Sequence, residues 1–88
     1  VGLDTETTGL DHATDRVRLI QLATCQGTFI IDVFEFPDPK STFEELFEVL
    51  AKFGVVGHNL GFDLPFLMKL GFVPGRVFDT MLTSQVLH

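Results

Sequence analysis

The sequence contains no tryptophan, no tyrosine and one cysteine, and its basic residues are few. With Cys25 alone, no disulfide can form within the chain. Six Lys and Arg are outnumbered by twelve Asp and Glu, which gives a formal net charge of −6. Such a chain cannot attract nucleic acid by charge alone unless cations intervene, and Arg16, Arg18 and Arg76 are too few to predict a basic track. Composition by itself favours a soluble acidic surface.

Long apolar runs are also missing, so no segment is long enough to cross a membrane, and no signal peptide is recognisable. We therefore expect a soluble intracellular protein. Apolar residues are nevertheless abundant: 45% of the 88 residues are hydrophobic and ten are Phe, enough for the core of one small domain. The chain begins in an apolar, strand-like segment without a start methionine and stops in a helical pattern. We expect a fragment of a longer protein.

The apolar pattern predicts an α/β fold in the order βββαβα, with a further helix starting near the end. Strands are expected at residues 1–7, 17–24 and 28–33. The turn Cys25 to Gly27 is short, so these strands are expected to form an antiparallel meander. Residues 17–24 are apolar on both faces, which indicates a central strand.

A Pro-containing linker at residues 36–40 is expected to precede the first helix. Ser41 as N-cap and Glu44 three residues later predict a capping box, and Gly54 predicts the helix end. Four apolar residues in one stripe face the core: Phe43, Leu46, Phe47 and Leu50.

The helix is expected to return the chain to a short strand at residues 55–57, parallel to the first strand. A second helix is expected at residues 60–70, with a late start to its regular part because of Pro65. Asp79 is expected to be the N-cap of a third helix.

Asp4 and Glu6 are the first residues that suggest chemistry. Residues two apart in a strand point to the same face, roughly 7 Å apart along the chain. Two carboxylates side by side offer the oxygen ligands that Mg²⁺ and Mn²⁺ favour. By itself, however, the pair is more typical of strand-end acids that face water.

Asp63 follows a strand that should lie beside the first one. It is expected near the same sheet edge, on a helix. Taken alone, it is more typical of a first-turn acid that interacts favourably with the helix dipole.

Together these segments resemble a known family. Leu3 to Leu10 (LDTETTGL) resembles the first motif of the DEDD superfamily of 3′–5′ exonucleases, and His58 to Asp63 (HNLGFD) resembles the second motif. Phe78 to Leu82 resembles the segment that follows in the proofreading domains of family A DNA polymerases and in ribonuclease D. The resemblance implies an RNase H-like three-layer fold, in which helices flank a mixed sheet.

The resemblance also implies chemistry and ligands. Asp4, Glu6 and Asp63 would hold two divalent metal ions, Mg²⁺ or Mn²⁺, for hydrolysis of the terminal phosphodiester. The implied partner is the 3′ end of single-stranded DNA or RNA. Residues 1–88 would then be a partial exonuclease domain, which can be joined to a polymerase domain in the parent chain, in a bacterial or phage-like cytoplasm.

Four further residues match substrate-binding positions of the family. Thr5 and Thr7 match positions near the terminal nucleotide, Leu10 matches a wedge beside the last base, and Asn59 matches a residue near the substrate backbone. Leu10 could instead pack within its loop, and Asn59 could cap the following turn.

The third motif of the family, which supplies a fourth carboxylate and a Tyr or His, has no match. We therefore expect the isolated fragment to be inactive or very weak. Three alternatives remain open: ribonuclease D-like trimming of RNA, a non-catalytic nucleic-acid-binding module, and a phosphatase of the haloacid dehalogenase class. The phosphatase pattern has a second Asp where this chain has Glu6, and no meander follows it.

Overall fold

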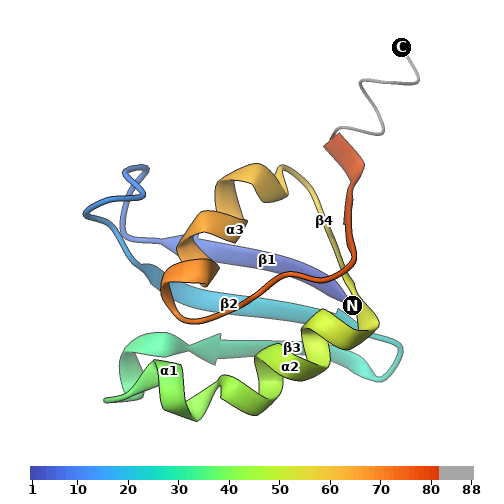
Figure 1. The fold of residues 1–88 in the computed structure, drawn as a ribbon, viewed down its shortest axis with the longest axis horizontal. Coiled ribbons are helices and arrows are strands. Elements are labelled where there is room, and N and C mark those ends of the chain that lie inside the picture. The colour runs from blue at the N-terminus through green and yellow to red at the C-terminus, as the bar shows by residue number, and fades with distance from the viewer. Residues whose placement is uncertain (82–88) are drawn as a thin grey trace.

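The strands of the protein form one five-stranded sheet, with its two longer helices on one face (Figure 1). The structure is a computed structural model and describes residues 1–81. In chain order the elements are β1 (Gly2–Thr7), β2 (Val17–Thr24), β3 (Gly27–Asp32), the 3₁₀ turn η1 (Val33–Glu35), α1 (Pro39–Thr42), α2 (Glu44–Phe53), β4 (Val55–Gly57), α3 (Leu60–Lys69) and β5 (Val77–Asp79).

The strand order across the sheet is β3-β2-β1-β4-β5. β1, β2 and β3 pair antiparallel, whereas β4 pairs parallel with both β1 and β5. The predicted α/β fold with a mixed sheet is therefore confirmed, as are the antiparallel meander and the central position of β2. β1 is also central: Gly2 pairs with Val56 of β4 on one side, and the segment that carries Asp4 and Glu6 pairs with β2 on the other.

One face of the sheet is buried beneath the helices. Leu3 and Ile20 point from β1 and β2 into a single core, where they meet apolar side chains of α2 and α3. The helical part of this core is Phe47, Leu50, Leu60, Phe66 and Leu67, each at most 4% exposed. Burying each such side chain contributes about 1.5–3 kcal/mol. Within the described residues the long helices thus form one layer, and the other sheet face is open.

The first helical segment begins earlier than the sequence predicted. α1 starts at Pro39, and the carboxylate of Asp38 accepts a hydrogen bond from the Ser41 amide at 3.4 Å. The predicted capping box at Ser41 and Glu44 is wrong, because proline at the first helical position with Asp before it makes the stronger start. The predicted end at Gly54 is confirmed: its φ is 85° and its amide donates to the Leu50 carbonyl at 2.9 Å.

Two further expectations need correction. α3 is helical from Leu60, and Pro65 lies inside it, so the expected late start is wrong. The short strand β5 was not predicted; it pairs with β4 through Val55–Val77 and Gly57–Asp79. Most of the expected third helix lies outside the described residues. Within residues 1–81, none of the helices combines the length and the apolar character that a membrane crossing requires.

Candidate active site

The end of β1 presents its side chains alternately to the two faces of the sheet. Asp4 and Glu6 are exposed on the open face, whereas Thr5 and Thr7 are partly buried on the helical side. Asp4 borders a shallow hollow of about 240 Å³. Its carboxylate also accepts a hydrogen bond from the Thr5 amide at 2.9 Å. The prediction that Asp4 and Glu6 share a face is confirmed.

Asp63 reaches the same strand from the other side. Its side chain is 5% exposed, in the first turn of α3, and it accepts a hydrogen bond from the Thr5 hydroxyl. Burial raises the pKa of the Asp63 carboxyl, and the negative charges of Asp4 and Asp79 raise it further, while the Thr5 hydrogen bond lowers it. Asp63 is therefore within electrostatic reach of Asp4.

The acids do not converge on one point in this arrangement. Among residues 1–81, no three Asp, Glu, His or Cys side chains are grouped closely enough to hold a metal ion together. The chemistry of Asp63 nevertheless fits a divalent cation, because burial and two neighbouring like charges disfavour its charge and a bound cation would stabilise it.

Asp79 organises the start of α3. Its two carboxylate oxygens accept hydrogen bonds from the backbone amides of Asn59 and Leu60, each at 2.9 Å, and one of them also accepts from Met81 at 2.9 Å. The predicted N-cap position is consistent with the Met81 contact. The two contacts to α3 were not predicted, since they require β5 to lie beside β4.

Asn59 occupies the N-cap position of α3 in a left-handed conformation, with φ 60° and ψ 48°. Its side chain makes no cap hydrogen bond and the residue is exposed. Asn adopts this conformation more readily than most residues. The amide group of Asn59 is therefore not used to cap the helix, which was the alternative to a substrate contact.

The loop after β1 carries Leu10, which is 83% exposed. The Thr7 hydroxyl donates to the Gly9 carbonyl at 2.6 Å and so fixes the turn just before Leu10. The alternative that Leu10 packs within its own loop is wrong, because almost all of its surface faces solvent.

His12 and Lys69 attach this loop to α3. The His12 ring contacts the Phe62 carbonyl at 3.0 Å and packs edge-on against Phe66. Lys69 donates from its ammonium to the carbonyls of His12 at 2.5 Å and Asp15 at 3.0 Å. The loop that presents Leu10 is thus held to the helix that carries Asp63.

Comparison with known proteins gives the family of the chain. A family model described as 3′–5′ exonuclease matches residues 1–88, so the chain belongs to this family. The resemblance to the DEDD exonuclease domains of family A polymerases is thereby confirmed. DNA polymerase I of Aquifex aeolicus (strain VF5) is 44% identical over 85 residues, or 97% of this chain. The chain spans 13% of the length of that relative.

Proposed function

We propose that this chain is part of a metal-dependent 3′–5′ exonuclease that removes nucleotides from single-stranded DNA ends, as in proofreading by a family A polymerase. The observation that carries the proposal is the hydrogen bond between Asp63 and Thr5, because Thr5 is the residue between the two carboxylates of β1 in the sequence. The match of the whole chain to the exonuclease family supports it.

Asp4, Glu6 and Asp63 are the residues that would hold two Mg²⁺ or Mn²⁺ ions. When bound, such ions lower the pKa of the attacking water and stabilise the leaving 3′ oxygen. Thr5 fixes the Asp63 carboxylate through its hydroxyl, and Asp79 fixes the start of α3 through two backbone amides. The residues around the metal ligands are thus already held in place by hydrogen bonds.

Substrate contacts form the second part of the proposal. Leu10, exposed at the tip of its loop, is suited to pack against the last base. The amide group of Asn59, which does not cap α3, can bond to the sugar-phosphate backbone, and Thr5 and Thr7 would shape the strand end beside the terminal nucleotide. The same proposal includes a cytoplasmic location, a polymerase domain in the parent chain, and a fourth metal-binding carboxylate beyond residue 88.

The experiment is an assay of the parent protein on single-stranded DNA and RNA of the same sequence, labelled at the 5′ end. With Mg²⁺ we expect a ladder of products shortened from the 3′ end, faster on DNA, and no products when EDTA removes the metal. Products formed only from RNA would replace proofreading with ribonuclease D-like trimming. A folded protein that binds the strands and cuts neither would instead be a non-catalytic binding module.

A further inference from the structure

Half of the six Lys and Arg residues of this acidic chain gather at one place. Arg16 and Lys69 line a pocket of about 390 Å³ between β2, η1, α1 and the end of α3, and Arg18 lies at its rim beside Phe34. No sequence pattern indicated this cluster, because pairing of β2 with β3 is what brings Phe34 beside the two arginines.

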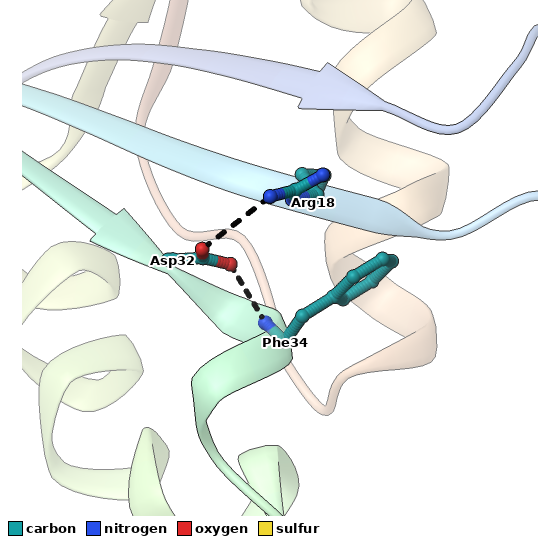
Figure 2. A network of polar contacts seen from close by, with 3 residues as sticks. All are labelled: Arg18, Asp32 and Phe34. Carbon is teal, nitrogen blue, oxygen red and sulfur yellow. Dashed lines mark hydrogen bonds and ion pairs between the residues drawn. The ribbon is translucent and has the colours of Figure 1, made fainter.

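A β-bulge directs Arg18 toward this cluster. β1 and β2 pair as Glu6–Leu19 and then as Thr7–Val17, so Arg18 is the residue that the register skips. Bulges of this kind redirect a side chain and are frequent beside active sites. Figure 2 shows the result: Asp32 forms an ion pair with Arg18 Nη2 at 3.7 Å and accepts a hydrogen bond from the Phe34 amide at 3.1 Å. Asp32 thus contacts both the arginine and the backbone of the aromatic residue.

Of the two arginines beside Phe34, Arg16 is the one without an ion pair in the part of the chain that the structure describes. Its guanidinium lies 4.9 Å from the centre of the Phe34 ring, and that of Arg18 lies at 5.4 Å. Within residues 1–81, Arg18 is paired with Asp32, whereas Arg16 has no carboxylate within ion-pair distance. Stacking on a ring uses the face of a guanidinium and leaves its N–H edge available for phosphate oxygens.

The pocket beside these cations is suited to a base. Its apolar wall includes Val17, Val33 and the aromatic rings of Phe34 and Phe36, which are 45% and 37% exposed. Aromatic rings and arginine planes beside a positive surface are the usual means of holding single-stranded nucleic acid without reading its sequence.

The cluster adjoins the candidate active site. The Thr8 amide donates to the Arg16 carbonyl at 2.9 Å, and the Arg16 amide donates to the Thr8 hydroxyl at 3.0 Å. The backbone of Arg16 is therefore held beside Thr8, which follows Glu6 by two residues at the end of β1. Arg16, Arg18 and Lys69 therefore place positive charge, beside Asp15 and Asp32, next to a group of carboxylates that repels phosphate.

We propose that Arg16, Arg18 and Phe34 form a second nucleotide-binding site, which holds a phosphate and a base of the single strand whose 3′ end lies at Asp4 and Asp63. This inference rests on the proposed function and adds to it a contact that keeps the strand on an otherwise acidic domain.

Steady-state kinetics of the parent protein on single-stranded DNA test the site. We expect Arg16→Gln and Phe34→Leu each to raise KM about threefold to tenfold, with kcat changed less than twofold. Arg16→Gln should also reduce the salt dependence of KM by roughly one phosphate contact. Arg76→Gln, an exposed arginine outside this cluster, is the matched control and should leave KM unchanged. Unchanged KM in both cluster variants would overturn the proposal.

A second measurement does not depend on cleavage. The parent protein with p-benzoylphenylalanine in place of Phe34 should crosslink to a labelled oligonucleotide in EDTA on irradiation. The same replacement at Phe53, which is 67% exposed beside Lys52, is the control and should not crosslink. Crosslinking at position 34 by a protein that cleaves no strand would contradict the proposed exonuclease function and support the second nucleotide-binding site. Cleavage without crosslinking at position 34 would overturn that site and leave the proposed function supported.

Discussion

An Asp63→Asn variant of the parent protein is expected to lose exonuclease activity by on the order of a thousandfold, while its α3 helix becomes more stable without metal. The carboxamide keeps the shape of the side chain, and its oxygen can still accept the Thr5 hydroxyl hydrogen bond. It cannot supply the charge that a divalent cation requires. It also relieves the cost of a buried charge that faces Asp4 and Asp79.

The stability effect is measured by hydrogen exchange of the α3 amides in EDTA. A gain of about 1 kcal/mol would slow their exchange roughly fivefold. Asp38→Asn is the matched control: it makes the same chemical change at an exposed helix cap, where Asn serves as well as Asp. We expect this control to retain activity and wild-type exchange. Full activity in Asp63→Asn would contradict the assignment of Asp63 as a metal ligand.

Asp79→Ala is expected to loosen the start of α3, because three backbone amides lose their acceptor together. Losing hydrogen bonds to a charged cap costs about 2 kcal/mol or more, which corresponds to roughly thirtyfold faster exchange of the α3 amides. We expect activity to fall as well, since α3 positions Asp63.

Asp79→Asn separates geometry from charge in this test. Its amide oxygen can accept one or two of the three hydrogen bonds, so its α3 exchange should lie between those of the wild-type and alanine proteins. Asp38→Ala, which removes one cap contact at α1, should leave the exchange of α3 unchanged. If Asp79→Ala exchanged like the wild-type protein, Asp79 would not be what holds the start of α3.

The sequence was sufficient to predict the strands and helices whose apolar pattern extends over many residues. The eight residues of β2 carry apolar side chains on both faces, which was enough to indicate a central strand, and Gly54 marks the end of α2. The three residues of β5 were missed because such a segment is too short for a periodic pattern, and Phe78 is half exposed. The start of α1 was misplaced because Asp38 and Ser41 are both good caps, and Pro39 decides between them.

For the candidate site, the sequence predicts residues but gives little of their geometry. The motifs predict Asp4, Glu6 and Asp63 as metal ligands, and strand periodicity correctly placed the first two on one face. The Thr5–Asp63 hydrogen bond joins residues 58 positions apart, which no local pattern can reveal. The same limit applies to Arg16 and Phe34, which come together only after β2 and β3 have paired.

The sheet order also bears on how the protein folds as it leaves the ribosome. β1 can pair with β2, its neighbour in the chain, as soon as both are made, whereas β4 can join its other side only after α2 has been made. Pairings between neighbouring segments close small loops and form early, whereas parallel pairings across a helix form late. Asp63 therefore approaches Asp4 at a late step, so the hairpin strands can form before the two carboxylates repel each other.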